Sequence, residues 1–118
     1  MRESVLKQKS YDFALKVIRV YKQIVAEHKE YVLSRQFLKA GTAPGALVRE
    51  AEYGQSKADF ISKLSIALKE AGECDYWTCL LRDSDLVSKT TALELLADNE
   101  EIIKMLTASI NTAKRNLQ

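Results

Sequence analysis

The chain has few of the residues that break regular structure or bind metals. Its 118 residues include one proline and four glycines, too few for the many turns of an all-β domain. The single histidine and two cysteines do not match the spacing of a metal site. No signal peptide opens the chain, and no apolar run approaches the roughly 20 residues needed to cross a membrane. These absences favour an all-α domain without a membrane span.

The two cysteines also indicate a compartment. Cys74 and Cys79 lie five residues apart in one predicted helix. Their side chains would point about 140° apart, so they cannot form a disulfide within the chain. Unpaired thiols fit a reducing compartment, and we therefore expect a cytoplasmic protein.

Apolar residues recur at helical spacing in four segments of the chain. The pattern predicts helices over about residues 10–27, 30–53, 57–82 and 89–114. Ser10 and Ser56 are suited to cap the first and third of these helices. Four helices with short connections fold as an antiparallel up-down-up-down bundle. The sequence therefore predicts an all-α four-helix bundle that forms a single domain over residues 1–118.

The middle of the second predicted helix combines small residues with the only proline. The run from Lys39 to Ala46 reads KAGTAPGA. Small side chains there let another backbone approach closely, while Pro44 removes one helical hydrogen bond and is expected to kink or split the helix. A phosphate-binding loop is rejected, because the GxxxxGK[ST] pattern and a preceding strand are both missing.

The third predicted helix carries apolar residues on two opposite faces. Its core face includes Leu64 and Leu81, whereas Ile66, Trp77 and Leu80 lie on roughly the opposite side. A helical stripe that contains Trp would be exposed in a monomer, so we predict a subunit interface there. The alternative is ordinary exposure of scattered apolar residues.

Two polar side chains are predicted to lie within the core. Asp75 falls in the core arc of the third helix and needs a cation, for which Lys39 or Arg35 is the expected partner. Asn99 falls in the buried stripe of the fourth helix and also needs a partner. We interpret Asp75 and Lys39 as a structural ion pair, because no nucleophile, metal set or second acid accompanies Asp75.

Cations gather on one side of the first predicted helix. The net charge of the chain is only +2, but residues 1–29 hold seven Lys or Arg against three acids. The cations that lie together away from the core are Lys9, Lys16, Arg19 and Lys22. They form either a strip that follows nucleic-acid phosphates or an ordinary solvated face. His28, at the end of this helix, is expected to be a cap or surface residue, since no second histidine can complete a metal site.

Several short runs match a known family pattern. They are Tyr31–Ser34, Gly45–Ala46, Ser56–Ile61, Ile66–Ala71, Asp75–Trp77 and Ile103–Leu106. In these runs the chain resembles the 23S rRNA-intervening-sequence protein family, also called the S23 family. It departs from the family pattern at Lys39, where Arg is usual, and at Leu47, where Asn is usual.

The resemblance implies a small, non-enzymatic bacterial four-helix bundle without a cofactor, often a homopentameric ring. Some members are encoded within inserts in ribosomal RNA genes. A relative, the accessory protein of diversity-generating retroelements, binds nucleic acid and a reverse transcriptase through basic surfaces. Two hypotheses follow: a homo-oligomer that binds structured RNA or DNA through the cations of the first helix, or a protein-interaction scaffold that binds no nucleic acid. An enzyme is disfavoured, since no paired acids, metal cluster or activated nucleophile can be assembled.

Overall fold

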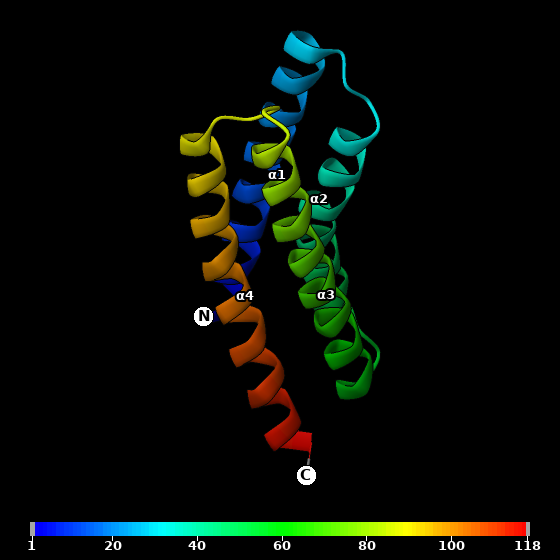
Figure 1. Ribbon diagram of the computed structural model, residues 1–118. Helices are drawn as coiled ribbons and strands as arrows, with labels where there is room; N and C mark the ends of the chain where they lie inside the picture. The colour runs from blue at the N-terminus through cyan, green and yellow to red at the C-terminus, as the bar shows by residue number, and fades with distance from the viewer. Residues whose placement is uncertain (1, 118) are drawn as a thin grey trace.

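Four helices make up most of the chain. The computed structural model describes residues 2–117, with side chains described for residues 5–116. The helices are α1 (Arg2–His28), α2 (Leu33–Glu52), α3 (Lys57–Asp83) and α4 (Lys89–Leu117). They run alternately up and down (Figure 1), so the predicted antiparallel four-helix bundle is confirmed.

Each helix packs against two neighbours. α1 contacts α2 and α4, and α3 contacts the same two helices, so α1 and α3 lie across the diagonal of the bundle. The bundle measures 50 × 21 × 20 Å. α1 projects beyond the other helices at one end, and the C-terminal part of α4 projects at the other (Figure 1). Because α1 and α3 are diagonal to each other, their outer sides point in opposite general directions.

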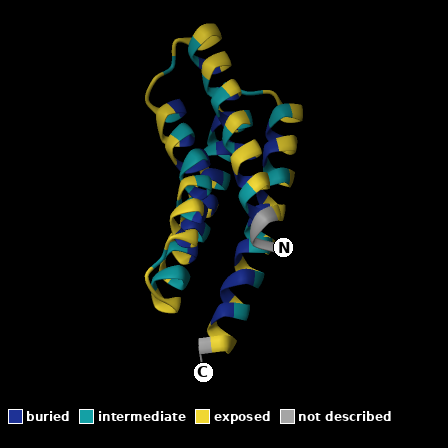
Figure 2. Cartoon of the chain, turned by 180° about the vertical axis from the view of Figure 1, so that it is seen from behind, coloured by how far each residue is buried: buried dark blue, intermediate teal, exposed yellow. Residues whose placement is uncertain are grey.

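The core is formed by the inward stripe of each helix. Because an α-helix turns every 3.6 residues, apolar residues three and four apart line up on one side. Figure 2 shows the buried residues on the inner sides of the helices and the exposed residues outside. The largest fully buried side chains come from all four helices and are Leu6, Val17, Ile24, Phe37, Pro44, Leu64, Thr78, Leu81, Leu95, Asn99, Ile102 and Leu106.

The start of α1 differs from the prediction. A first helix beginning near residue 10 is wrong, since α1 begins at Arg2. Leu6 is only 1% exposed and continues the inward stripe, so the earlier start buries another turn of apolar surface. Ser10 is consequently not a cap. It is buried inside the helix, where its Oγ donates to the Lys7 carbonyl oxygen at 3.1 Å.

A carboxylate determines where α2 begins. The helix starts at Leu33 rather than at residue 30, because Glu30 caps it from outside. The Glu30 carboxylate accepts hydrogen bonds from the backbone N–H groups of Val32, Leu33 and Ser34, each at 2.8 Å. Partial burial acts to raise the pKa of Glu30, but these hydrogen bonds outweigh it and hold the pKa below its usual value.

The caps of α3 and α4 follow the usual rules. Ser56 caps α3 as predicted, since its Oγ accepts a hydrogen bond from the Asp59 backbone N–H at 3.1 Å. Ser88 caps α4 in the same way by accepting from the Thr91 N–H at 3.0 Å. α3 ends at Asp83, one residue past its predicted end, and α4 continues to Leu117, past the predicted end at residue 114.

Pro44 does not divide α2. The helix continues through it from Leu33 to Glu52. The small residues beside Pro44 allow close packing, as predicted. A Cβ at Gly41 would lie 2.6 Å from Cγ2 of Val17, and a Cβ at Gly45 would lie 3.2 Å from the carbonyl oxygen of Ser10. α1 and α2 therefore approach more closely than larger side chains would allow.

We expect Gly41→Ala to lower the free energy of unfolding by about 1–3 kcal/mol, because the added methyl group overlaps the Val17 side chain. Gly72 on α3 is a matched control, since no heavy atom lies within 4 Å of a Cβ built there, the helix's own nearby backbone aside. Gly72→Ala should raise stability by up to about 1 kcal/mol through helix propensity alone. Urea unfolding measures both variants, and equal effects would contradict the packing argument.

Acid should destabilise the start of α2. A carboxylate whose pKa falls on folding adds stability above its unfolded pKa, and this stability is lost as the pH falls through the folded pKa. For Glu30 the loss therefore lies below its ordinary pKa of 4.5. Glu30→Gln should cost about 0.5–2 kcal/mol near neutral pH and remove this part of the acid sensitivity. Urea unfolding at about pH 7 and about pH 3 gives the free energy of unfolding of both proteins. If this free energy falls with acid as much in the variant as in the wild type, Glu30 does not have this role.

Candidate functional site

Half of the predicted basic strip on α1 is neutralised by acids of α4. Lys9 Nζ lies 3.0 Å from Glu101 Oε2, and Lys16 Nζ lies 2.6 Å from Asp98 Oδ2. The other two cations, Arg19 and Lys22, are exposed and form no ion pair with another described residue. The strip thus keeps two free positive charges.

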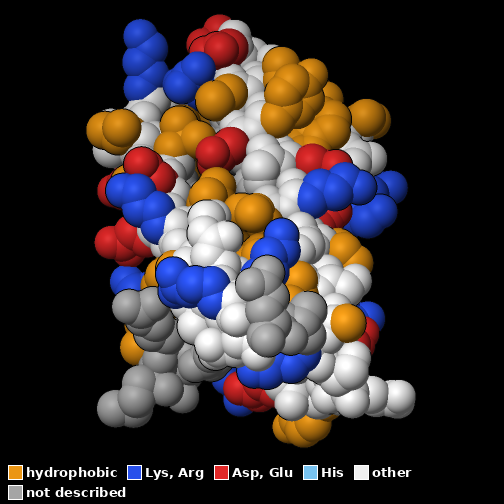
Figure 3. Space-filling model, turned by 90° about the horizontal axis from the view of Figure 1, so that it is seen from below, with side chains coloured by type: hydrophobic (Ala, Val, Ile, Leu, Met, Phe, Trp, Pro, Cys, Tyr) orange, Lys and Arg blue, Asp and Glu red, His pale blue; other side chains and the backbone are white. Residues whose placement is uncertain are grey.

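A groove of about 260 Å³ runs along this seam between α1 and α4. Cations and acids both line it, together with the apolar side chains of Phe13 and Ile102. A surface that follows phosphates needs an excess of positive charge, which this groove does not have. Figure 3, viewed from the end at which α4 terminates, likewise shows Lys and Arg among acidic and hydrophobic side chains rather than one basic face. Nucleic-acid binding through the strip stays a prediction.

The predicted ion pair between Asp75 and Lys39 is wrong. Lys39 is exposed on α2, and Asp75 Oδ1 instead accepts a hydrogen bond of 2.7 Å from Asn99 Nδ2. The same Asn99 nitrogen donates to the Ala71 carbonyl oxygen at 2.8 Å. The Asn99 amide nitrogen therefore supplies Asp75 with its partner, because the two residues lie on the sides of α3 and α4 that face one another. Asn99 Oδ1 is buried without a hydrogen-bond partner among the described residues.

The predicted interface stripe on α3 is only partly exposed. Ile66 is 44% exposed, whereas Trp77 and Leu80 are half-buried. Trp77 packs against the core and also edge-to-face against Tyr76, with ring centroids 5.1 Å apart. Tyr76 is itself 59% exposed and extends the apolar surface. The predicted exposure is thus confirmed for Ile66 and only in part for Trp77 and Leu80. The role of this stripe as a subunit interface stays a prediction.

A second exposed apolar surface lies on α1, where the sequence pattern was not interpreted as a site. Tyr11 is 47% exposed and Leu15, one turn further on, is 39% exposed. The Arg49 guanidinium of α2 lies over the Tyr11 ring, 5.2 Å from its centroid. Both residues are apolar yet fall outside the inward stripe of α1. That position in the sequence pattern could have predicted this exposed apolar surface.

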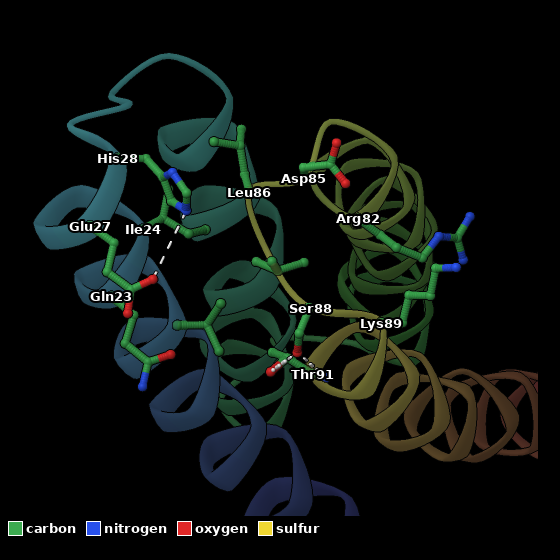
Figure 4. A pocket seen from close by; sticks show the side chains of 12 residues that line it. Gln23, Ile24, Glu27, His28, Arg82, Asp85, Leu86, Ser88, Lys89 and Thr91 are labelled. Atoms are coloured by element: carbon green, nitrogen blue, oxygen red, sulfur yellow. Dashed lines mark hydrogen bonds and ion pairs between the residues drawn. The ribbon is translucent and has the colours of Figure 1, made fainter.

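A cavity of about 440 Å³ lies between the end of α1 and the connection from α3 to α4. Figure 4 shows Arg82 and Lys89 on the side of α3 and α4, turned away from Glu27 and His28. Glu27 and His28 lie 3.9 Å from each other at the end of α1. Among the residues that line this cavity, no nucleophile is brought to an acid or a base, so the geometry does not form a catalytic site.

The two cysteines, Cys74 and Cys79, are both free, as predicted. Burial raises the pKa of the Cys74 thiol to about 12, so this thiol is neutral and unreactive near neutral pH. Within the described residues no group of three or more His, Cys, Asp or Glu side chains could hold a metal ion. No helix in this part of the chain has the length and apolar character of a membrane span.

Comparison with known proteins now identifies the family. The profile described as 23S rRNA-intervening sequence protein matches residues 2–108. The chain belongs to the 23S rRNA-intervening sequence protein family. The resemblance drawn from the sequence is therefore confirmed. A search of the curated proteins found no match.

A solved structure has the same fold. It is the crystal structure, at 1.70 Å resolution, of a protein with unknown function from the S23 ribosomal protein family of Bacteroides thetaiotaomicron VPI-5482. The two chains are 45% identical with a TM-score of 0.92, and the match covers 94% of this chain and 99% of the other. Neither the family description nor this structure assigns an activity.

Replacing Asn99 should loosen the contact between α3 and α4. Asn99→Ala removes the amide nitrogen that donates to both the Asp75 carboxylate and the Ala71 carbonyl oxygen. This loss should lower the free energy of unfolding by about 1–3 kcal/mol. Asn111→Ala, on the exposed side of α4, makes the same change in helix propensity and serves as the control. Urea unfolding compares the two, and equal losses would show that the Asn99 hydrogen bonds contribute nothing.

Proposed function

We propose that this chain is a non-enzymatic scaffold subunit that associates head to tail with copies of itself. The observation that carries the proposal is the presence of two exposed apolar surfaces with opposite charge on diagonal helices. The α1 face consists of Tyr11, Leu15, Arg19, Lys22 and Arg49. The α3 face consists of Ile66, Glu70, Glu73, Tyr76 and Trp77.

The charges favour contact between unlike faces. The α1 face holds three cations, and the α3 face holds two carboxylates. The same asymmetry runs through the chain, because residues 1–53 hold ten Lys or Arg and six acids, whereas residues 54–118 hold eight and ten. A symmetric contact would set like charge against like charge, which is unfavourable. An α1 face against the α3 face of the next copy pairs opposite charges and covers apolar surface on both.

The α3 face borders α2, and so does the Tyr11 end of the α1 face, whereas Arg19 lines the groove toward α4. Arg49 belongs to α2 and lies over Tyr11. On α3, Lys63 Nζ lies 3.7 Å from Glu50 Oε1 of α2, and residues 70 and 77 follow Lys63 along the same edge at seven-residue spacing. Copies joined through two faces inclined toward α2 would curve, with α2 on the inside. Head-to-tail contacts that curve in this way can close into a ring, and five copies are the number that the family resemblance implies.

Binding of RNA or DNA has less support than the scaffold function. Lys9 and Lys16 are occupied by acids of α4, which leaves Arg19 and Lys22 of the predicted strip. In the proposed assembly these two cations lie at the contact between copies. Few cations of the strip would then remain to release counterions from a phosphate backbone.

Two single variants test the head-to-tail contact. Leu15→Glu damages only the α1 face, and Ile66→Glu damages only the α3 face. Each variant alone should assemble about a hundredfold more weakly than the wild type, because a charged carboxylate replaces an apolar side chain and would have to lose its water at the contact. Mixed in equal amounts, they should form a dimer of one copy of each, since one intact face of each kind remains. Sedimentation velocity measures these sizes.

Leu93→Glu is the control for this experiment. Leu93 is 70% exposed on α4, outside both faces, so its replacement should leave the assembly unchanged. A wild-type protein that remains monomeric would refute the proposed self-association. Dimers of either damaged variant alone would show that the contact is symmetric rather than head to tail.

A further inference from the structure

One carboxylate at the proposed contact has an unsatisfied oxygen. Oε2 of Glu70 is buried and has no hydrogen-bond partner within the described residues. Lys63, seven residues before Glu70 on α3, is paired with another acid, since its Nζ lies 3.7 Å from Glu50 Oε1. A carboxylate oxygen held away from water without a donor is unfavourable, so Glu70 needs a donor that the described part of the chain does not supply.

A cation on the opposite face lacks an acid. Arg49 is exposed and forms no ion pair with another described residue, but its guanidinium is held over the Tyr11 ring at 5.2 Å from the centroid. The aromatic ring restricts the side chain without using its N–H donors, which point in the plane of the guanidinium. Arg49 is therefore positioned in advance to donate to a group that arrives at the α1 face.

We infer that Glu70 of one copy accepts a bidentate hydrogen bond from Arg49 of the next. The inference rests on the head-to-tail association proposed above and names the residues that pair within it. A guanidinium matches both oxygens of a carboxylate at once, whereas an ammonium group does not. Glu70 is only half-buried as a residue, so rotation of its carboxylate can bring either oxygen to the surface. In the assembly, Tyr11 and Leu15 would then lie against Ile66 and Trp77 and exclude water from the pair.

A charge swap tests this pairing. Glu70→Arg and Arg49→Glu should each weaken assembly by about tenfold or more, because each sets like charges together at every contact. The double variant restores opposite charges at every contact and should assemble within about threefold of the wild type. Sedimentation velocity over a range of concentrations gives these ratios, and urea unfolding of each variant verifies that the bundle is intact.

Glu73→Arg combined with Arg49→Glu is the matched control. Glu73 lies on the same face one turn from Glu70, so this second swap should not restore assembly. A double variant of residues 49 and 70 that is no better than the product of the single effects would refute the pairing. A strong effect of Glu70→Arg together with no effect of Arg49→Glu would also refute the pairing, since it would assign Glu70 a role that does not involve Arg49.

The mixing experiment separates this inference from the proposed function. A mixed dimer of the Leu15→Glu and Ile66→Glu variants without rescue by the charge swap would retain the head-to-tail contact and exclude only the Glu70–Arg49 pair. A monomeric wild-type protein would exclude both.

Discussion

The close contact between α1 and α2 is the constraint on which the rest of the structure depends. Gly41 and Gly45 bring the α2 backbone against Val17 and Ser10, and interiors packed to this density leave little freedom to slide or rotate one helix on the other. The contact determines how α1 is turned. That rotation places Leu6 in the core and leaves Tyr11 and Leu15 outside, where Arg49 can lie over Tyr11. The proposed α1 face is thus a consequence of two small side chains on α2.

Charged and polar groups attach α4 to the rest of the bundle. Within one turn of α4, Asp98 pairs with Lys16, Asn99 bonds to Asp75, and Glu101 pairs with Lys9. The two ion pairs are partly exposed, and such pairs contribute only about 0–1 kcal/mol each. Their main effect is on register, since a shift of α4 would separate all three contacts at once. The same pairs remove much of the positive charge that could have recognised phosphate.

The sequence predicted the bundle well because helices depend on local periodicity. The caps and packing that follow from one residue type, such as Ser56 at the start of α3 and the small residues around Pro44, were also predicted correctly. The start of α1 was missed because Val5 and Leu6 are the only apolar residues from position 2 to position 10 of the sequence, too few to show a helical period. Only the burial of Leu6 shows that the inward stripe extends. Lys39 was predicted as the partner of Asp75 because a cation on the preceding helix would balance the carboxylate. Asn99 of α4 supplies the hydrogen bond instead.

The sequence by itself determined the four helices, their antiparallel order and the family to which the chain belongs, because all three follow from residue type and spacing along the chain. Only the tertiary structure decided which cations are neutralised and which apolar side chains stay exposed. Those outcomes depend on the rotation and axial offset of each helix, which the packing of the whole core determines. Lys16 and Arg19 stand three residues apart on one helix, yet the first meets Asp98 and the second faces solvent.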